Sequence, residues 1–367
     1  MTCSIHPVAF RSRSAVAISN DHVELIIVMG GGHLASFTRR DQPVNVFWEP
    51  AWASLDPGLR RIQSRETYGD GPEAGLLSGI LGHNLCVDVF GAQSDGEVAA
   101  GLAIHGEVGL VAWEALSAQV VRGEATLVMR ARLPESFLEV TRSVRLRDGA
   151  SCVRVEESVR NLTGVERVYG CAQHVTLGEA FLKDAPALFA CNADKGRTWP
   201  QPSAEKHSTW AVAADFDYPD VPRRDGGKAD WRRYPRDARN SDRCTLRVRP
   251  QDELGWFTAV QNACRLGVYY IWERAAYPWL MTWEENYTRA GKPWNEHTLT
   301  RGLEFSSYAF ALSRQTNVDI GRLFDTPAFQ WLDAHATRTT RYEFGLHAMD
   351  RTVEEAPPIS AFHPLAG

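Results

Sequence analysis

The sequence predicts an all-β protein, folded as one large antiparallel β-sandwich. Short runs of residues alternate between apolar and polar side chains, and a period near two is typical of strands with one buried face. Turn signals such as Arg-Asp-Gly at 147–149 and Asn-Leu-Thr-Gly at 161–164 recur about every ten residues, as in antiparallel sandwiches. Before residue 310 no long stretch has the 3.6-residue period of an amphipathic helix, and no linker separates two apolar halves. We therefore expect a single domain over residues 1–367.

Between residues 20 and 190, nine runs are expected to form strands. In the run SCVRVEESVRNLTG, at 151–164, Cys152, Val153 and Val155 interleave with charged residues, so this run predicts one buried and one wet face. The other eight runs are VELIIVM, LASFT, VNVFW, LCVDVFG, GLVAWEALSAQVVRG, ATLVMRARLP, LEVTRSVRLRDG and ERVYGCAQHVTLG.

A glycine-rich segment, VMGGGHLASFT, contains the spacing G-x-G-x-x-A at Gly30, Gly32 and Ala35. That spacing opens many dinucleotide-binding domains, but only where it joins a strand to a helix. Here charged residues at 39–41 and Pro43 follow instead, and then the β-rich run VNVFW. The glycines therefore predict a tight turn, where a missing Cβ permits positive φ, and we expect no cofactor.

Residues 192–243 break the rhythm of strands because they are rich in Pro, Gly, Asp and Arg. Trp199, Trp210 and Trp231 are spaced through this segment, and disordered chain seldom carries tryptophans. We expect a long irregular insertion outside the core, of the kind that acts as a lid or a binding loop.

Strand-like runs resume after this insertion as CTLRVRP, WFTAVQNA, LGVYYIWE, WLMTWEEN and GLEFSSYAFAL. Residues 319–333 are predicted to form a short helix near the C-terminus, and 337–349 a last strand that returns to a sheet.

The composition limits the class of protein and its partners. A hydrophobic content of 44%, with 12 Trp, 15 Phe and 10 Tyr, is ample for a large core. The net charge of −5 gives no electrostatic reason to expect nucleic acid or an anionic membrane as a partner. The first residues lack the apolar core of a signal peptide, no apolar run approaches the ~20 residues of a membrane span, and the seven cysteines form no C-x-x-C pair. We expect a soluble, cytoplasmic protein with reduced thiols.

Three stretches place ionisable side chains beside turns: GLAIHGEVGLVAWE with His105, YGCAQHVTLGE with His174, and TRGLEFSSYAF with Glu304. Histidine titrates near neutral pH and a carboxylate accepts protons, so these residue types suit general acid–base chemistry. In an alternating strand, Glu304 lies on the face opposite Leu303 and Phe305. The pattern alone is equally compatible with structural histidines and with a glutamate that points into solvent.

The order of these residues resembles that of the galactose mutarotase-like, or aldose 1-epimerase, superfamily. The segment GGGHLASFTRRDQPVNVFWEP resembles the opening hairpin of that family. His105 and Gly106, followed by Trp113, resemble its HG motif. His174 in QHVTLG resembles its second histidine, and Glu304 in GLEF resembles its late glutamate. The resemblance spans most of the chain and implies a β-supersandwich whose concave sheet carries a sugar-binding cleft.

What the resemblance implies for function is the interconversion of sugar anomers. Opening a pyranose ring requires a proton on the ring oxygen and removal of one from the C1 hydroxyl, so one acid and one base suffice. By resemblance, His174 is the acid and Glu304 is the base. His105 would hold the ring oxygen or a neighbouring hydroxyl.

Sugar ligands predict further residues for the cleft, because their C–H faces stack on aromatic rings and their hydroxyls need fixed polar partners. From the segment YYIWERAAYPWLMTWEENY, we expect Trp283, Glu284 and Arg274 to contact the substrate. His83 and Asn84, expected at a turn, are predicted to bind hydroxyls. The expected partner is a small sugar or the end of an oligosaccharide, bound by a monomer or a homodimer.

Three departures from the family pattern point to a divergent branch. Galactose-acting members carry an arginine in an N-R-I stretch before the HG motif, whereas this chain reads GHNLCVDV there. Glu107 replaces the second glycine of their H-G-G, and the insertion at 192–243 is longer than in the family. The substrate is therefore expected to be another aldose, a sugar derivative or an oligosaccharide end.

Two alternatives keep the fold and change the function. A polysaccharide lyase or glycoside hydrolase would use two carboxylates across the cleft, which for hydrolysis lie ~5 to 9.5 Å apart, and Glu304 with Glu284 or Glu285 would qualify. A non-catalytic carbohydrate-binding protein would keep Trp283 and tolerate loss of the acid and the base.

A metal enzyme is the third alternative. The H-x-E spacing of His105 and Glu107 would place both side chains on one strand face, where His174 or His83 could complete a site. First-row metal sites usually need three or four convergent ligands, and only two are locally paired here, so we predict no metal.

Overall fold

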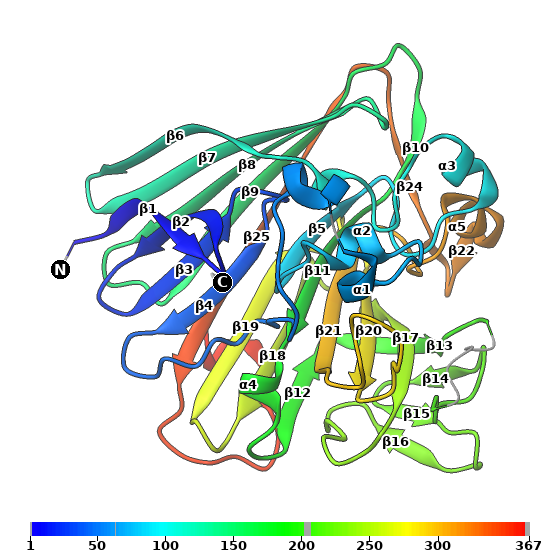
Figure 1. The fold of residues 1–367 in the computed structure, drawn as a ribbon. Coiled ribbons are helices and arrows are strands. Elements are labelled where there is room, and N and C mark those ends of the chain that lie inside the picture. The colour runs from blue at the N-terminus through cyan, green and yellow to red at the C-terminus, as the bar shows by residue number, and fades with distance from the viewer. Residues whose placement is uncertain (1, 63, 202–206, 364–367) are drawn as a thin grey trace.

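Two large antiparallel sheets, packed face to face, form the body of the computed structural model (Figure 1). The structure describes residues 2–62, 64–201 and 207–363. In spatial order the first sheet consists of β1 (Ser4–Phe10), β2 (Arg13–Ser19), β3 (Val23–Val28), β4 (Leu34–Arg39), β5 (His83–Val87), β11 (Cys171–Leu177), β21 (Leu299–Ser306), β20 (Trp279–Asn286), β17 (Ser241–Val248), β13 (Ala193–Thr198) and β14 (Asp215–Asp217). The second sheet consists of β12 (Ala187–Cys191), β18 (Leu254–Gln261), β19 (Leu266–Glu273), β25 (Thr337–Ala348), β9 (Cys152–Asn161), β8 (Leu138–Arg147), β7 (Glu124–Leu133) and β6 (Glu114–Val121). The all-β sandwich predicted from the alternating runs is confirmed.

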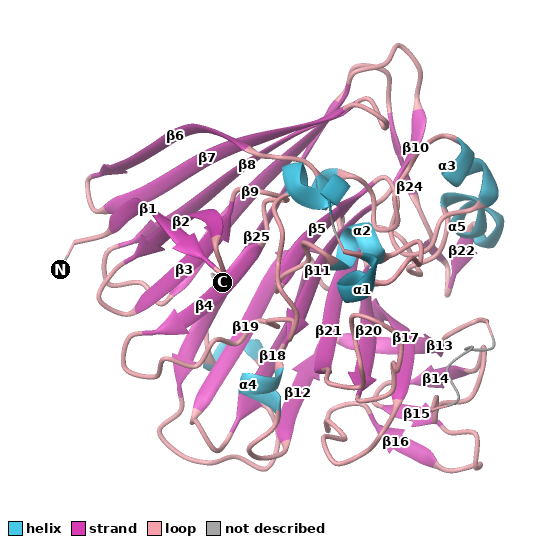
Figure 2. Cartoon of the chain, viewed as in Figure 1, coloured by secondary structure: helices cyan, strands magenta, loops and turns pink. Residues whose placement is uncertain are grey.

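Short helices and two-stranded ribbons lie around the two large sheets (Figure 2). Three two-stranded ribbons pair β10 (Arg167–Tyr169) with β24 (Gln330–Leu332), β15 (Asp220–Pro222) with β16 (Lys228–Asp230), and β22 (Arg322–Leu323) with β23 (Thr326–Pro327). The helices are α1 (Arg65–Tyr68), α2 (Ala74–Leu77), α3 (Asp95–Ala99), α4 (Glu179–Leu182) and α5 (Arg314–Ile320), with 3-10 turns at Pro57–Ile62, Val108–Leu110 and Ile359–Ala361. In Figure 1, α1 and α2 lie in front of β5, β11 and β21, over the face of the first sheet that is turned away from the second.

The core lies between the two sheets, because each strand directs alternate side chains inward. In β9, Val153, Val155 and Val159 are buried, whereas Arg154 is exposed. Large aromatic rings fill the centre; Trp272 of β19 stacks on Phe305 of β21 with ring centroids 4.4 Å apart. Offset stacking of this kind adds to the free energy gained by burying apolar area.

A buried ion pair also lies between the sheets. Arg142 Nε of β8 and Glu157 Oε1 of β9 are 2.6 Å apart, and both side chains are 1% exposed. The same guanidinium donates to the carbonyl of Gly32, and Gln173 of β11 donates to Glu157. The pair therefore joins the second sheet to the glycine-rich turn and to the strand that carries His174.

The glycine-rich segment forms the predicted tight turn. Gly31 and Gly32 have positive φ angles of 82° and 64°. A Cβ on Gly32 would lie 2.5 Å from the Trp113 ring, so no other residue fits there without movement. The turn connects β3 to β4, which rules out the strand-to-helix junction of a dinucleotide site.

Three local expectations are corrected. Residues 44–48 form no strand and contribute only an isolated bridge between Phe47 and Leu177. The helix expected at 319–333 is wrong, because α5 ends at Ile320 and the ribbon β22–β23 and strand β24 follow. Strands β1 and β2 were not predicted, although they form the first edge of the sheet.

The segment 192–243 is more ordered and more buried than its composition predicts. It contains β13, β14, β15 and β16, and its residues 202–206 lie outside the described residues. Trp210 and Trp231 are 6% and 1% exposed and belong to the main hydrophobic core, so the expectation that this segment lies outside the core is wrong. Trp231 Nε1 donates to Thr282 Oγ1 of β20 at 2.9 Å, which anchors the segment to the first sheet.

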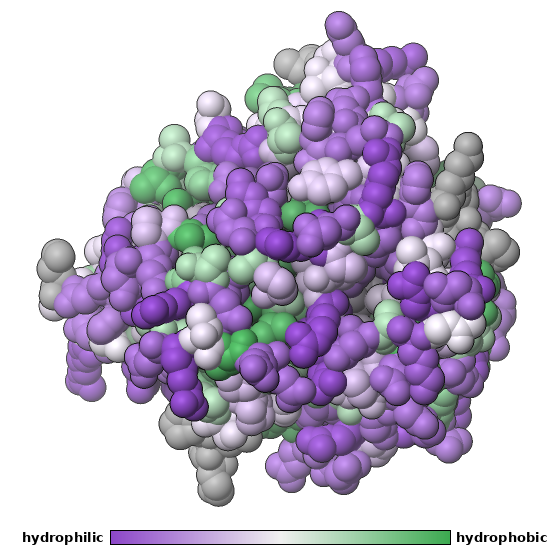
Figure 3. All heavy atoms as spheres, turned by 90° about the horizontal axis from the view of Figure 1, so that it is seen from below, coloured by the Kyte–Doolittle hydropathy of each residue, from purple (hydrophilic) through white to green (hydrophobic). Residues whose placement is uncertain are grey.

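The face of the molecule seen from below is largely hydrophilic, with smaller hydrophobic areas between the hydrophilic residues (Figure 3). Within the described residues, no helix combines the length and the apolar character needed to cross a bilayer.

Candidate active site

A pocket of about 390 Å³ opens on the face of the first sheet that is turned away from the second. Its floor is formed by His174 of β11, Glu304 of β21, Met281 and Trp283 of β20, and Arg243 of β17. These side chains share one face because the inward positions of the same strands are occupied by core residues. The volume lies within the range of ~300 to 1,000 Å³ that is usual for small-molecule sites.

His174 and Glu304 meet on this floor. The two residues are directly opposite one another in the pairing of β11 with β21. His174 Nε2 lies 3.3 Å from Glu304 Oε1, and His174 Nδ1 hydrogen-bonds Thr176 Oγ1 at 3.0 Å. No hydrogen-bond donor among the described residues satisfies either carboxylate oxygen of Glu304, which leaves that group available to a ligand.

Burial shifts the pKa values of these two groups in opposite directions. It raises the pKa of Glu304 to about 8, although the nearby Arg243 guanidinium lowers it, and it lowers the pKa of His174 to about 4. Between these values Glu304 holds a proton and His174 does not. The floor therefore offers one proton donor and one proton acceptor throughout the neutral range.

His105 is a third ionisable residue of the pocket, and it lies in a turn where two successive residues have positive φ angles. Its φ is 60° and that of Gly106 is 75°, and a Cβ on Gly106 would lie 2.2 Å from the carbonyl of Val87. A glycine is required there because the turn approaches the backbone of β5 so closely. The His105 ring lies 5.1 Å from that of His174 between centroids, its Nδ1 is 3.4 Å from Cys86 Sγ, and burial lowers its pKa well below the usual value.

One side of the pocket is aromatic. Trp48 stacks on Trp294 with centroids 5.7 Å apart, and Trp283 meets the edge of Trp294 at 6.1 Å. The Arg289 guanidinium lies over the rings of Trp294 and Trp283, at 4.6 and 5.5 Å from the centroids. Glu285 orients this arginine, because its Oε1 accepts from the Arg289 backbone and its Oε2 forms an ion pair with the side chain at 3.4 Å.

Two of the predicted ligands lie on the wrong face of their strands. Glu284 points into the sandwich, where its carboxylate lies 3.6 Å from Arg301 and accepts from Asn240 at 2.9 Å, and burial raises its pKa to about 7. His83 lies within β5, not at a turn, and its ring hydrogen-bonds Tyr270 at 3.1 Å and Gln173 at 2.9 Å between the sheets. Neither side chain lines the pocket, so the structure places both apart from the cleft in which they were expected.

Arg274 and Asn84 also differ from expectation. Arg274 follows β19 and lines a different groove, so it lies apart from the pocket in which it was expected to contact the substrate. Asn84 lies in β5 opposite His174, on the face of the pocket, but its side chain is 1% exposed and is covered by its neighbours. Glu284 is turned inward and Glu285 is paired with Arg289, and neither carboxylate lines the pocket with Glu304.

The proposed H-x-E metal pair is not on one strand face. Positive φ angles at His105 and Gly106 turn the chain, and the Glu107 carboxylate accepts from the backbone of Glu135 at 3.2 Å and of Ser136 at 2.7 Å. Among the described residues, no group of three or more His, Cys, Asp or Glu side chains has the arrangement of a metal site.

Sequence reasoning missed Arg243, Arg289, Trp199, Trp294 and Glu73, all of which line the pocket. Arg243 carries a usable signal, because it alternates with Cys244 and Leu246 of the core in the run DRCTLRV. The others come from loops, whose positions no periodic pattern predicts.

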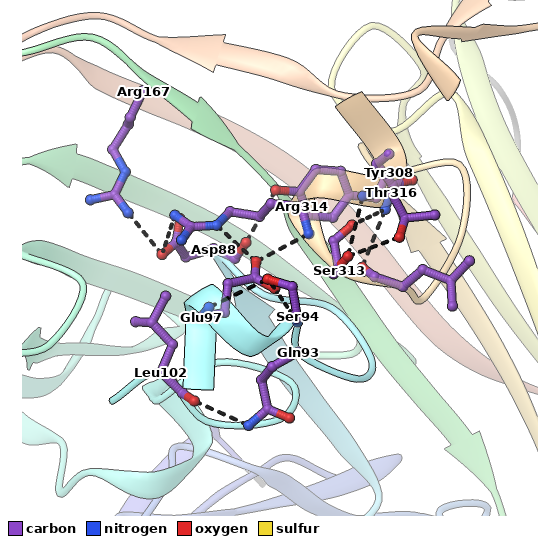
Figure 4. Close-up of polar contacts among 12 residues, drawn as sticks. Asp88, Gln93, Ser94, Glu97, Leu102, Arg167, Tyr308, Ser313, Arg314 and Thr316 are labelled. Atoms are coloured by element: carbon purple, nitrogen blue, oxygen red, sulfur yellow. Dashed lines mark hydrogen bonds and ion pairs between the residues drawn. The ribbon is translucent and has the colours of Figure 1, made fainter. Parts of the chain in front are cut away.

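A polar network joins the segment after β5 and α3 to the start of α5 (Figure 4). The Asp88 carboxylate pairs with Arg167 at 2.8 Å and with Arg314 at 3.3 Å. Glu97, which caps α3 through Ser94, pairs with the same Arg314 at 2.9 Å. Through Arg314, the network holds the loop that leads to His105 against α5. This helix comes after β21, the strand that carries Glu304.

This chain has the galactose mutarotase-like fold. It superposes on a galactose mutarotase-like protein from Clostridium acetobutylicum with a TM-score of 0.62 and 12% identity, over 95% of this chain and 99% of that one. A candidate aldose 1-epimerase from Klebsiella pneumoniae matches with a TM-score of 0.62 and 13% identity, over 92% and 80% of the two chains. A Synechocystis protein matches with a TM-score of 0.59 and 16% identity, over 94% and 99%. No protein-family model and no curated protein sequence matches.

Proposed function

We propose that the chain is an aldose 1-epimerase-like enzyme that interconverts the anomers of a sugar. The observation that carries this proposal is the contact between His174 and Glu304, 3.3 Å apart on the floor of a pocket of about 390 Å³. A buried pair that holds a single proton can give one proton and accept another without a cofactor. The mutarotase-like fold supports the same reaction by analogy of fold.

The reaction requires two proton transfers at neighbouring oxygens. A base takes the proton of the C1 hydroxyl, an acid delivers one to the ring oxygen, and the C1–O5 bond breaks to give the open-chain aldehyde. Rotation about the C1–C2 bond then exposes the other carbonyl face, and the same two groups reverse their roles as the ring closes. We assign the base to Glu304 and the acid to His174, with the proton passing to the imidazole before ring opening.

The remaining residues of the pocket would bind and orient the sugar. His105, uncharged and 5.1 Å from the His174 ring, would hydrogen-bond the ring oxygen or a neighbouring hydroxyl. The Trp283 ring, at the edge of His174, offers a face on which sugar C–H groups stack. Arg243 and Arg289, which also line the pocket, would help to orient the sugar.

The test follows the anomeric proton signals of a panel of freshly dissolved aldoses and sugar derivatives. The wild type should speed equilibration of at least one sugar, and Glu304→Gln and His174→Gln should each lower that rate by about 10²- to 10⁴-fold, as expected for loss of one acid–base group. Sugar binding, measured by calorimetry, should survive either substitution.

Arg274→Gln is the control. The sequence predicted Arg274 in the cleft, but in the structure this residue lines a different groove. The variant should keep the wild-type rate. If no sugar in the panel equilibrates faster with the wild type, yet one binds, the chain is a carbohydrate-binding protein. If glycosides are cleaved instead, the assignment to an epimerase is wrong.

A further inference from the structure

A second groove, of about 730 Å³, lies apart from the candidate active site. It is formed by the turn after β19 and by the segment from α5 to β25, and it shares no lining residue with the first pocket. Of the elements that border it, α5 and β22 lie at the right-hand edge of Figure 1, and β24 lies further in, beside β10.

An exposed aromatic ring lines this groove. Trp331 is 51% exposed, although its backbone is fixed by pairing with Val168 of β10. Phe329, partly buried, meets the Trp331 ring edge-on with centroids 5.8 Å apart. A ring with a rigid backbone and a supported edge is a flat platform on which the C–H face of a sugar can stack with little loss of conformational entropy.

Three arginines line the same groove: Arg274, Arg322 and Arg338. Each is held by uncharged partners. Arg338 donates to the side chain of Gln330 and, at 3.3 Å, to the carbonyl of Trp331. Arg322 donates to the carbonyl of Asp325, and Arg274 donates to that of Val248 at 3.4 Å.

These bonds fix the guanidinium groups but do not neutralise them. Asp333 is the one carboxylate among the described lining residues, and no ion pair joins it or another described carboxylate to the three arginines. A guanidinium has five donors in a planar fork that fits carboxylate, sulfate or phosphate, so each arginine keeps donors for a ligand. The groove therefore combines an excess of positive charge with an aromatic platform, in a chain whose net charge is −5.

We propose that this groove binds an anionic saccharide, a sugar whose carboxylate, sulfate or phosphate groups pair with the arginines while one ring stacks on Trp331. The single exposed ring favours a saccharide over single-stranded nucleic acid, whose sites offer a succession of aromatic platforms. A neutral sugar would leave the arginines without counter-charges. The proposal is independent of the epimerase proposal, because the two sites share no residue.

Calorimetric titration at low ionic strength tests it, with the linear trimer of galacturonic acid as the probe. Maltotriose serves as the neutral trisaccharide, sodium sulfate as the simple anion, and hexathymidylate as the nucleic acid. The galacturonate trimer should bind at least tenfold more tightly than maltotriose or sulfate, and more tightly than hexathymidylate.

Variants assign the binding to the groove. Trp331→Ala should weaken trimer binding by at least about fivefold and Arg338→Gln by about tenfold, as expected for loss of a stacked ring and of a charged hydrogen bond. Phe137→Ala, at an aromatic residue 61% exposed elsewhere, and Arg160→Gln, at an exposed arginine of β9, are the matched controls and should leave binding unchanged. Glu304→Gln should also leave it unchanged, which separates this groove from the active site.

Four results would overturn the proposal: equal binding of maltotriose, equal binding of sulfate, tighter binding of hexathymidylate, or trimer binding that Trp331→Ala and Arg338→Gln do not weaken. Failure of all four probes to bind would overturn it as well.

Discussion

At the scale of single residues, the candidate active site depends on the burial of two groups that would both be charged in water at slightly acidic pH. Glu304 and His174 are 1% and 5% exposed, and each shifts toward its uncharged form. Because one pKa rises to about 8 and the other falls to about 4, neither a doubly protonated nor a fully deprotonated pair is populated near pH 6.

The rate of anomer equilibration should therefore have a bell-shaped dependence on pH. Below about pH 4 both groups are protonated and no base remains, whereas above about pH 8 both are deprotonated and no acid remains. The measurement is kcat/KM between these limits, after subtraction of the spontaneous rate at each pH. A rate that rises continuously with pH would contradict a shared proton.

Arg243 gives this prediction a direction that can be checked. Its positive charge lowers the pKa of Glu304, so Arg243→Gln should move the alkaline limb of the profile to higher pH. A variant that only perturbs packing would lower the maximum without displacing the limb.

The sequence identified the catalytic candidates better than the ligands, for a geometric reason. His105, His174 and Glu304 come from three distant segments, and the resemblance in their order was enough to bring them together. Trp283 and Glu284 were expected in one cleft, but neighbours in a strand point to opposite faces, so only one of them reaches it. The alternation of residues along a strand shows which side chains share a face of the sheet. Which of the two faces belongs to the core depends on where the second sheet packs.

At the scale of elements, short helices and loops form the walls of the candidate active site, and ion pairs with buried carboxylates fix their positions. Arg314 begins α5 and lies between Asp88 and Glu97, whose side chains are 1% and 4% exposed. The loop between these two carboxylates and His105 is short, and the His105 backbone donates to the carbonyl of Gly91 at 3.1 Å. Displacement of this loop would therefore move His105.

Arg314→Gln should reduce the free energy of unfolding by about 1–3 kcal/mol. This is less than the ~3–5 kcal/mol for a fully buried pair, because Arg314 is 26% exposed and Asp88 keeps Arg167. Denaturant unfolding measures the loss, and the rate of anomer equilibration should fall with it, while Arg314→Lys recovers part of both. Arg132→Gln, which breaks the exposed contact with Glu139, should cost less than about 1 kcal/mol. Equal losses in the two variants would show that the network does not hold the loop.

Element boundaries were harder to predict than strand identity, as the C-terminal helix illustrates. Ser313 caps α5 by accepting from the Thr316 backbone, and Gly321 ends it with a φ of 63°. Both signals stand in the sequence, but the apolar spacing of 319–333 suggested a later helix. The burial of the segment 192–243 was mispredicted because its composition is that of an exposed loop. Its burial depends on contacts between distant residues, such as that of Trp231 with Thr282, 51 residues away.

At the scale of the whole molecule, the sandwich has to join two sheets whose facing surfaces are not entirely apolar. Arg142, Glu157, Gln173 and His83 form a connected polar chain between them, from the second sheet to the strands of the site. Alternation places Arg142 in phase with Val140 and Val144, and Glu157 in phase with Val155 and Val159, so both occupy inward positions of their strands. Their charge gives no sign of which partner each one meets there. Burial of both charges is tolerable only while they remain paired.

Arg142→Met should therefore destabilise the fold by about 3–5 kcal/mol, because it leaves the Glu157 carboxylate buried without its cation. The double variant Arg142→Met with Glu157→Met should be more stable than Arg142→Met alone, since no buried charge remains. Arg154→Met, which removes an exposed partner of Glu343 on the outer face, is the control and should cost less than about 1 kcal/mol. Calorimetric melting of the three variants checks the order. If Arg142→Met melts no lower than Arg154→Met, the sheets are held by the aromatic core alone, and the ion pair has another role, such as fixing the glycine-rich turn through the carbonyl of Gly32.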